Sequence, residues 1–261
     1  MELELEGRRA VVTGASKGIG LAVVRRLVTE GATVIAGSRR SSPELDLLRD
    51  GGSVVHVSVD LSGAEGPLRL VETALGGGPV DILINNAGAV NPRLGGFNSV
   101  TDEQWNDTIA LTFMAAVRTI RAILPHMMDR RQGSVVNNAS VNATLPDPLV
   151  IDYSAAKAAL VNFSKALSKE VGPHGVRVNA VSPGPVSTEL WLGTKGVAAT
   201  VSAAQGSDPN DVAHQAVENT ATGRFSTPEE VADLIAFLAS SRASNVTGAN
   251  FIIDGGLSQD I

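Results

Sequence analysis

Short runs of β-branched residues alternate along this chain with longer segments of helical periodicity. The run "RRAVVT" at 8–13 stops at a glycine, and "IGLAVVRRLVTEG" then follows the period of an amphipathic helix that ends at Gly31. Further strand-like runs, with helical segments between them, lie at 32–37, 53–60, 80–88, 133–140, 176–184 and 249–256. Strands that alternate with helices predict an α/β fold with a doubly wound parallel sheet, whose ligands bind at the carboxyl ends of the strands.

The length and composition favour one compact globular domain. With 261 residues the chain can bury a sizeable core, and no Pro/Ser-rich linker, low-complexity tract or internal repeat divides it. Hydrophobic residues make up 43% of the chain and charged residues 18%, which is typical of folded rather than disordered proteins. We therefore expect a single domain over residues 1–261.

The same composition argues against several classes of partner. The opening "MELELEGRRA" is acidic and alternating, unlike a signal peptide, and no apolar run reaches membrane-spanning length. A formal net charge of −6 disfavours broad contact with nucleic-acid phosphates. The absence of cysteine fits a reducing compartment, and the four histidines show no metal-ligand spacing. We expect a soluble, cytoplasmic protein with no metal, no nucleic-acid partner and no membrane contact.

A glycine-rich loop, "TGASKGIG" at 13–20, joins the first predicted strand to the first predicted helix. Gly14, Gly18 and Gly20 allow a tight turn and let backbone N–H groups approach a pyrophosphate at the helix N-terminus. Glycine also ends strands for purely conformational reasons, but the strand before and the helix after are the context that a dinucleotide site requires. The loop therefore predicts a dinucleotide-binding sheet of the Rossmann type.

The end of the second strand distinguishes between the two common dinucleotides. An acidic residue there binds the ribose hydroxyls of NAD, whereas an arginine accommodates the additional phosphate of NADP. In "VIAGSRRSS", Ser38 is followed by Arg39 and Arg40, and Lys17 of the glycine loop adds a third cation. Guanidinium groups suit bidentate phosphate contacts. NADP(H) is therefore favoured over NAD(H); the alternative is that the two arginines belong to an ordinary solvated loop.

The only tyrosine of the chain, Tyr153, lies in the alanine-rich segment "DYSAAKAAL", four residues before Lys157. Such a segment predicts a helix, in which side chains at i and i+4 share one face. Taken alone, a pair of this kind is more often a half-buried ring beside a solvated charge than a catalytic pair. Its meaning depends on the rest of the chain.

Several motifs in a fixed order resemble those of the short-chain dehydrogenase/reductase family over nearly the whole chain. They are "TGASKGIG", "NNAG" at 85–88, "YSAAK" at 153–157, "SPGPVST" at 182–188, and "GRFSTPEEVADLIAFLAS" with "VTGANFIIDGG" toward the C-terminus. Ser140, thirteen residues before Tyr153, occupies the family's catalytic serine position. The resemblance implies an enzyme that transfers a hydride between NAD(P)(H) and a carbonyl compound or secondary alcohol.

This resemblance gives the tyrosine and lysine a chemical role. A free phenol has a pKa of about 10, and a nearby ammonium group, here that of Lys157, stabilises the phenolate. In ketone reduction Tyr153 would donate a proton to the carbonyl oxygen as a general acid, and oxidation would use it as a base. Ser140 would hydrogen-bond the same oxygen, and the family analogy adds a bond from Lys157 to the nicotinamide ribose.

One position departs from the family pattern. The family usually has an asparagine seven residues after a tryptophan, where it helps to hold a water that links the lysine to solvent. Counting from Trp105 gives Thr112. Threonine keeps a hydroxyl but loses the amide, so we expect a proton relay that is altered, slower or borne by another water. The alternative is that Thr112 only caps or packs within its helix.

The same resemblance implies which residues surround the cofactor. Asp60 matches the position that contacts the adenine amino group, and Val186 and Thr188 would bond the carboxamide. The "NNAG" motif would line the adenosine ribose, although Asn and Gly also favour ordinary turns. The predicted cofactor-binding residues are Gly14, Ser16, Lys17, Gly18, Ile19, Gly20, Ser38, Arg39, Asp60, Leu61, Asn86, Ala87, Gly88, Tyr153, Lys157, Pro183, Gly184, Val186 and Thr188.

The segment 189–222 is expected to select the substrate. It is rich in Gly, Ala and Ser, and in this fold it would form a mobile lid with short helical pieces beside the nicotinamide. Neither this segment nor the one before Tyr153 has a cluster of cations, so we expect a neutral or apolar carbonyl substrate. Ordinary packing is an equal alternative for the apolar residues that would form the two walls, which are Leu190, Trp191, Leu192, Leu145, Pro146 and Leu149.

Two classes of function remain open from the sequence. The first is an NADP(H)-dependent reductase, including ketoreductases of the 3-oxoacyl or polyketide kind or an enzyme acting on a small secondary alcohol. The second is a dinucleotide-binding sensor or structural subunit with weak or no turnover. Family members commonly assemble as tetramers or dimers, and small residues in the predicted helices at 103–129 and 153–171, with the apolar strand "FIIDGG", suggest a homo-oligomer.

Overall fold

The sheet has the doubly wound parallel arrangement that the sequence predicts. The computed structural model describes residues 2–259, so both ends of the predicted 1–261 domain lie outside the described residues. Within that part of the chain, seven strands pair in parallel in the order β3-β2-β1-β4-β5-β6-β7. The strands are β1 (Arg9–Thr13), β2 (Thr33–Ser38), β3 (Val54–Ser58), β4 (Ile82–Asn85), β5 (Gly133–Asn138), β6 (Val176–Pro183) and β7 (Asn250–Ile253).

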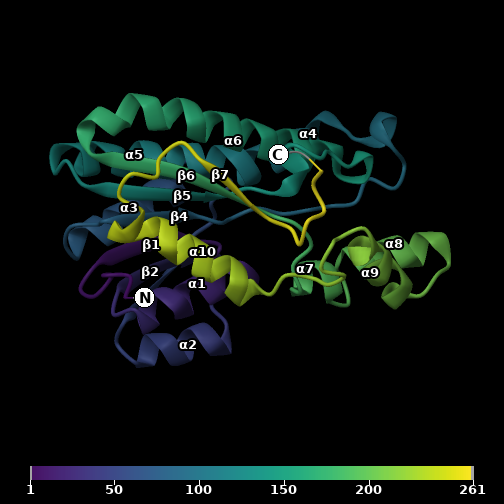
Figure 1. Cartoon of the computed structure of the whole chain (residues 1–261), viewed down its shortest axis with the longest axis horizontal. Coiled ribbons are helices and arrows are strands. Elements are labelled where there is room, and N and C mark those ends of the chain that lie inside the picture. Colours follow the sequence, from purple (N-terminus) through teal and green to yellow (C-terminus); the bar gives the residue numbers. More distant parts are fainter. Residues whose placement is uncertain (1, 260–261) are drawn as a thin grey trace.

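Helices cover both faces of this sheet (Figure 1). One layer holds α1 and α10, which pack against each other, and the other holds α3, α5 and α6. The strand order reverses between β1 and β4, which creates a crevice for ligands at the carboxyl edge. The helices are α1 (Gly18–Thr29), α2 (Pro43–Asp50), α3 (Glu65–Gly76), α4 (Asp102–Ile109), α5 (Ala115–Asp129), α6 (Ile151–Val171), α7 (Glu189–Leu192), α8 (Val197–Gln205), α9 (Pro209–Glu218) and α10 (Pro228–Ala239).

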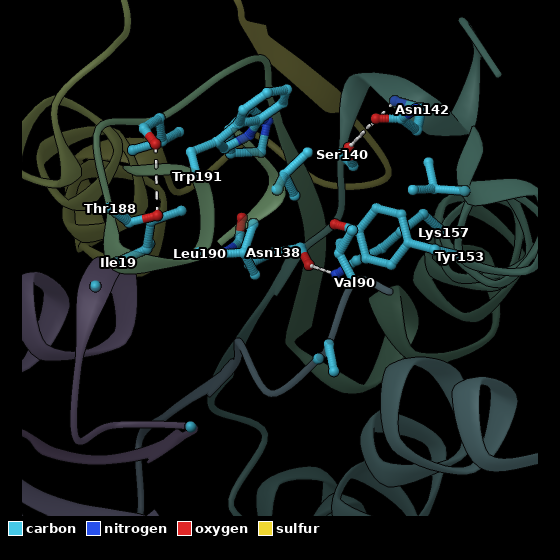
Figure 2. A pocket seen from close by; sticks show the side chains of 18 of the residues that line it. Ile19, Val90, Asn138, Ser140, Asn142, Tyr153, Lys157, Thr188, Leu190 and Trp191 are labelled. Carbon is cyan, nitrogen blue, oxygen red and sulfur yellow. Dashed lines mark hydrogen bonds between the residues drawn. The ribbon is translucent and has the colours of Figure 1, made fainter. Parts of the chain in front are cut away.

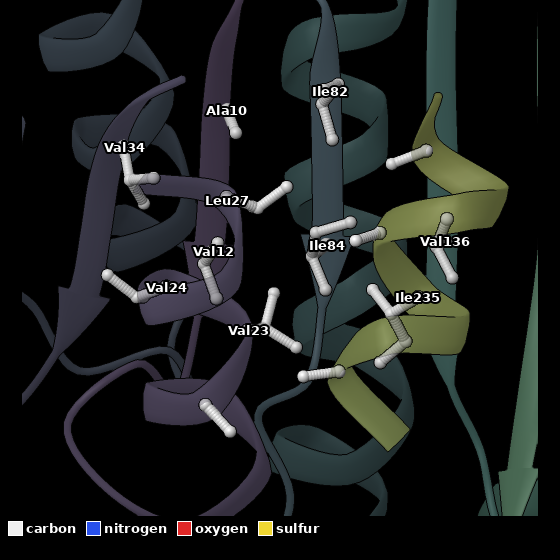
Figure 3. Packing of buried hydrophobic residues seen from close by; sticks show 14 of the residues in the cluster. Ala10, Val12, Val23, Val24, Leu27, Val34, Ile82, Ile84, Val136 and Ile235 are labelled. Atoms are coloured by element: carbon white, nitrogen blue, oxygen red, sulfur yellow. The ribbon is translucent and has the colours of Figure 1, made fainter. Parts of the chain in front are cut away.

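Successive residues of a strand enter two different hydrophobic cores. Val12 of β1 lies beside Ile84 of β4, and both join the core under α1 and α10, where Leu27 is fully buried (Figure 3). Val11 and Leu83, one position earlier in the same pairing, face the other core under α3, α5 and α6. A strand buried on both faces needs apolar residues at consecutive positions. This explains why the strands appear in the sequence as unbroken β-branched runs.

Local signals in the sequence set where several helices begin. At the start of α10, Glu230 N–H donates to Thr227 Oγ1 at 3.2 Å, and Thr227 N–H donates to Glu230 Oε2 at 2.8 Å. Pro228 occupies the first helical position, where its missing N–H costs nothing. The same reciprocal bonds between Thr101 and Gln104 start α4. Each pair satisfies N–H groups that would otherwise lack partners.

The helix predicted over 103–129 is interrupted. A π-helical turn, η2 (Ala110–Met114), separates α4 from α5, and such turns often occur at functional sites. The stretch Asp102–Asp129 contains an 18-residue window that is apolar enough to cross a membrane by length and composition, so the prediction that no apolar run reaches that length is wrong by this criterion. A helix that packs on a sheet can be equally long and apolar. Ile123 and Met127 of α5 are fully buried in the core between this helix and the sheet.

Strands β4 and β5 end a few residues before the positions that the sequence pattern predicts. The predicted strand 80–88 stops at Asn85, and the predicted strand 133–140 stops at Asn138. Ser140 is therefore not a strand residue but the N-cap of a short 3₁₀ turn, η3 (Val141–Ala143). The chain leaves the sheet before these polar residues, which places them on loops along the carboxyl edge. Helices α7, α8 and α9 lie together beside that edge, on the right in Figure 1.

Candidate active site

A cavity of about 1260 Å³ runs along the carboxyl edge of the sheet. It extends from the glycine loop before α1 to the helices α7–α9. Every residue that the sequence predicts for the site lines this cavity, with the exceptions of Gly20 and Thr112. The fold therefore gathers residues from the loops after six strands, β1 to β6, at one place.

The glycine loop makes close backbone contacts that a side chain would prevent. Gly14 has a φ of +66°, and a Cβ on it would lie 3.0 Å from the Cα of Ala87. A Cβ on Gly20 would lie 2.2 Å from the carbonyl oxygen of Gly14 and 2.5 Å from Nδ2 of Asn86. Gly20 does not line the cavity, and its predicted contact with the cofactor stays a prediction. Gly20 lies behind the loop and lets α1 pack against it.

The start of α1 fits the pyrophosphate of a dinucleotide. Lys17 is the N-cap, but no side chain caps this helix and its first turn contains no acidic residue. The first N–H groups of the helix and its dipole are then available to an anion, which a capping carboxylate would otherwise repel. Gly18, with a φ of +53°, keeps this approach open. The residues present at this end therefore fit a dinucleotide.

The loop after β2 presents two exposed arginines to the cavity. Ser38 Oγ donates to the carbonyl oxygen of Arg40 at 2.8 Å and lies 3.0 Å from Nε2 of His56, so Ser38 shapes the turn that carries Arg39 and Arg40. The pKa of Asp60 is below its ordinary value, chiefly because Ser62 hydrogen-bonds the carboxylate, with a further contribution from the positive charge of Arg39. These arginines therefore lie at the same end of the cavity as the predicted adenine contact.

The predicted catalytic residues Ser140, Tyr153 and Lys157 line the other end of the cavity. Lys157 Nζ lies 5.6 Å from the centroid of the Tyr153 ring and donates to the carbonyl oxygen of Asn138 at 2.5 Å. Figure 2 shows Lys157 reaching toward Asn138 with the Tyr153 ring beside it, and Leu190 and Trp191 across the cavity. The i and i+4 spacing read from the sequence therefore places both side chains on one face of the helix, as predicted.

Burial dominates the electrostatics of this pair. It lowers the pKa of Lys157 to about 7 and raises the pKa of Tyr153 to about 12, with a hydrogen bond from Ser140 acting in the opposite direction on the phenol. Burial thus opposes the stabilisation of the phenolate that the sequence leads us to expect from the Lys157 ammonium. A charge costs free energy in an apolar surrounding, and both residues therefore favour their neutral forms.

A buried ion pair lies beside the catalytic helix. Arg93, in the loop after β4, bonds the carboxylate of Asp152 through Nε at 3.1 Å and through Nη2, and Thr108 Oγ1 donates to the same carboxylate at 2.7 Å. Burial opposes ionisation of Asp152, but these bonds and the Arg93 charge outweigh it and lower its pKa. Asp152 immediately precedes Tyr153, so the pair fixes the start of α6 against α4. No sequence motif indicated it.

The walls near the catalytic residues are mostly apolar. Leu145, Pro146 and Leu149 line the cavity on one side, and Leu190 and Trp191 line it on the other. Leu192 does not, because it points to solvent with 51% of its surface exposed. The prediction of two apolar walls is confirmed for five of these six residues, and the Trp191 ring is held by an edge contact with Phe225 at 5.7 Å between centroids.

Comparison with known proteins decides the family. A family profile described as "short chain dehydrogenase" matches residues 8–195. The chain belongs to the short-chain dehydrogenase/reductase family. It is 34% identical over 259 residues to the 3-oxoacyl-[acyl-carrier-protein] reductase of Vibrio harveyi, with 98% of this chain and 99% of that relative covered.

Solved structures of short-chain dehydrogenases are closely similar. The L-sorbose reductase of Gluconobacter frateurii, complexed with NADPH and L-sorbose, has a TM-score of 0.91 and 34% identity, with 100% of both chains covered. A 3-oxoacyl (acyl-carrier-protein) reductase of Agrobacterium tumefaciens with NADP bound has a TM-score of 0.85 and 30% identity over 98% of this chain and 96% of its own. The predicted NAD(P)-dependent oxidoreductase is thereby confirmed.

Thr112 remains the departure from the pattern of the short-chain dehydrogenases. It lies in the π-helical turn η2, is 1% exposed, and its Oγ1 has no hydrogen-bond partner in the described part of the chain. Thr112 Oγ1 and Lys157 Nζ both lie close to Gly88. A Cβ placed on that glycine would be 3.8 Å from Thr112 Oγ1 and 3.7 Å from Lys157 Nζ. The structure does not support a capping role, because η2 begins at Ala110. An altered relay through Thr112 stays a prediction.

Burial of Lys157 predicts that the cofactor-free protein becomes more stable as the pH rises above 7. Its pKa is about 7 in the folded protein against an ordinary 10.5, so between these values the unfolded chain binds more protons and a higher pH favours folding. The slope from one such group is at most about 1.4 kcal/mol per pH unit. We expect the free energy of unfolding, measured in urea, to rise more between pH 7 and 9 for the wild type than for Lys157→Met.

The control for this measurement is Lys169→Met, which removes an exposed lysine from the same helix. It should keep the pH dependence of the wild type. Equal slopes for the wild type and Lys157→Met would contradict the pKa assigned to Lys157.

Proposed function

We propose that this short-chain dehydrogenase uses NADP(H) to reduce a neutral carbonyl compound, and to oxidise the corresponding secondary alcohol, with Tyr153 as general acid and base. The observation that carries the proposal is the meeting of Ser140, Tyr153 and Lys157 in one cavity whose other end is the glycine loop. The similarity to reductases solved with NADPH or NADP supports it.

Each catalytic residue has a role that its position allows. The bound nicotinamide would supply a hydride to the carbonyl carbon. Tyr153 donates its proton to the carbonyl oxygen, so that C=O becomes CH–OH, and Ser140 hydrogen-bonds the same oxygen. A phenol with a pKa of about 12 is protonated at neutral pH, which suits it to donate a proton. Lys157, with a pKa of about 7, can replace that proton from solvent at neutral pH.

The charge distribution in the cavity supports a neutral substrate. Apart from Lys157, the basic residues that line it are Lys17, Arg39 and Arg40, and all three lie at the cofactor end. The acidic Asp147 is occupied as the cap of the turn Pro148–Val150. A carboxylate or phosphate on the substrate would therefore find no counter-ion near Tyr153 other than Lys157 itself. We propose that α7, α8 and α9 form the lid that selects among neutral substrates, over the predicted range 189–222.

Two further functions are kept as alternatives. Reduction of 3-oxoacyl or polyketide thioesters is favoured by the 34% identity to a 3-oxoacyl reductase over nearly the whole chain. A dinucleotide-binding protein with weak turnover is favoured by Thr112, whose buried hydroxyl is unpaired among residues 2–259. The complete set of Ser140, Tyr153 and Lys157 supports the reductase over this second alternative.

The decisive experiment replaces Tyr153 by phenylalanine. The purified protein is given NADPH or NADH with aliphatic, aromatic and β-keto carbonyl compounds, and cofactor oxidation is followed. We expect turnover with NADPH that falls by at least about a hundredfold in Tyr153→Phe, because general acid catalysis contributes about 10²–10⁴-fold. The dissociation constant of NADPH should change little. A phenylalanine variant with full activity would contradict the role of Tyr153, and NADPH binding without any turnover would favour the binding-only alternative.

The proposed preference for NADP(H) predicts a selective effect of Arg39→Ala. Loss of a charge-assisted bond to the additional phosphate should weaken NADPH binding by about tenfold or more and leave NADH binding within about twofold. Dissociation constants are measured by fluorescence titration. Arg25→Ala, which removes an exposed arginine of α1 outside the cavity, is the matched control. Equal weakening of both dinucleotides would contradict phosphate recognition by Arg39.

We also propose that the protein forms a homo-oligomer, a tetramer or a dimer. An 18-residue apolar window of the helical stretch Asp102–Asp129 is only 39% buried, and β7 is an edge strand on which Ile252 is 42% exposed. Both features leave apolar surface that a second copy would cover. Light scattering at micromolar concentration should give a multiple of 26.9 kDa. A monomer under these conditions would contradict the proposal. Cytoplasmic location stays a prediction from the sequence.

A further inference from the structure

The side-chain NH₂ group of Asn142 lies next to the proposed reacting groups and is available to donate hydrogen bonds. Its Oδ1 accepts a hydrogen bond from Ser140 Oγ at 3.1 Å, and its backbone N–H donates to Ser140 Oγ at 3.2 Å (Figure 2). Both bonds follow from the 3₁₀ turn η3, which Ser140 caps. The two N–H donors of Nδ2 have no hydrogen-bond partner in the part of the chain that the structure describes, and Asn142 lines the cavity.

Few other neutral hydrogen-bonding groups reach the space around Tyr153. Most side chains of the surrounding wall are apolar, among them Val90, Leu149 and Trp191. Gln215 also lines the cavity, but it belongs to α9 and is exposed at the rim. Trp191 carries an indole N–H but lies across the cavity from Ser140. On the Ser140 side, the amide of Asn142 is the donor that can distinguish one neutral ketone from another.

The shared bond to Ser140 fixes where this donor acts on a substrate. Ser140 is proposed to donate its one O–H to the reacting oxygen, in place of its bond to Asn142 Oδ1, while the backbone N–H of Asn142 still donates to Ser140 Oγ at 3.2 Å and keeps the two residues adjacent. An acceptor that reaches Nδ2 must therefore lie close to the reacting oxygen within the same molecule. Oxygens on the carbon next to the carbonyl, or one carbon beyond, meet this condition, whereas an oxygen at the far end of a long chain does not.

We propose that Asn142 selects carbonyl compounds that carry a second oxygen one or two carbons from the reacting carbonyl, by donating a hydrogen bond from Nδ2 to that oxygen. This inference rests on the proposed reductase function. Hydroxyketones and 3-oxoacyl compounds both belong to this chemical class, and simple alkyl ketones of the same shape do not. Asn142 therefore acts as a specificity residue in addition to positioning Ser140.

The test uses pairs of ketones that differ only by an ether oxygen in place of a methylene group. Methoxyacetone is paired with 2-pentanone, and 4-methoxy-2-butanone with 2-hexanone. The variant Asn142→Asp keeps an acceptor for Ser140 but has no N–H for the ether oxygen. We expect the ratio of kcat/KM for the ether ketone to kcat/KM for its alkyl partner to fall by about tenfold in at least one pair, the effect of one lost hydrogen bond.

Comparing ratios removes two other effects. The intrinsic reactivity of each ketone cancels between wild type and variant, and so does any general effect of the new carboxylate on Tyr153 or Ser140. Asn162→Asp, which adds the same charge on an exposed position of α6, is the matched control and should leave the ratio unchanged. Asn142→Leu is a second variant with the same prediction, in case the carboxylate impairs folding. NADPH binding reports whether each variant is folded.

The outcomes separate this inference from the proposed function. A ratio that falls in both Asn142 variants and not in Asn162→Asp supports recognition of the second oxygen. An equal loss on both ketones of a pair shows that Asn142 only positions Ser140 and overturns the inference, as does an unchanged ratio. Failure of the wild type to reduce any ketone, despite NADPH binding, contradicts the reductase function itself and with it the inference.

Discussion

The active site depends on the contact between the end of β1 and the loop after β4. Thr13 Oγ1 accepts hydrogen bonds from the N–H groups of Asn86 at 2.9 Å and Ala87 at 3.1 Å. The Asn86 amide bonds the carbonyl oxygens of Thr13 and Gly14, both at 3.1 Å, and accepts a bond from Asn138 at the end of β5 at 2.9 Å. The glycine loop, the floor of the cavity and the strand before Ser140 are thus joined at the point where the strand order reverses.

These bonds give partners to most of the amide groups buried at this edge, although Asn85 Oδ1 and Asn138 Oδ1 have none among the described residues. Polar groups here are buried, and a buried polar group costs about 1–3 kcal/mol when it has no partner. Asn85 bonds Asn137 in the neighbouring strand at 2.8 Å, and Asn137 bonds Ser164 of α6 at 2.8 Å. Paired strands of the sheet therefore carry a row of amides toward the catalytic helix. Asn137 thus joins β4 and α6, and the next residue of β5, Asn138, accepts the bond from Lys157 of that helix.

The sequence predicts those features that short-range patterns encode. The sheet, the glycine loop and the spacing of Tyr153 and Lys157 follow from periodicity and from motifs of a few residues. Arg93 and Asp152 are 59 positions apart, and nothing in either neighbourhood indicates their pairing. No sequence pattern predicts the π-helical turn around Thr112 either, because its residues have ordinary helical propensity. The pKa values of Tyr153 and Lys157 depend on burial, which no local pattern measures, and burial acts on the phenol against the stabilisation expected from Lys157.

Helix α6 carries two buried charged residues near its start, and the structure treats them differently. Asp152 accepts hydrogen bonds from Arg93 and Thr108. These bonds hold Asp152 in its ionised form, because protonation of the carboxylate would leave the buried charge of Arg93 unpaired. Lys157 instead donates to the carbonyl oxygen of Asn138. A carbonyl accepts a bond from the protonated and the neutral amine alike, and a pKa of about 7 leaves both forms populated at neutral pH. The paired charge therefore holds the catalytic helix in place, while the lysine one turn away is free to gain and lose a proton.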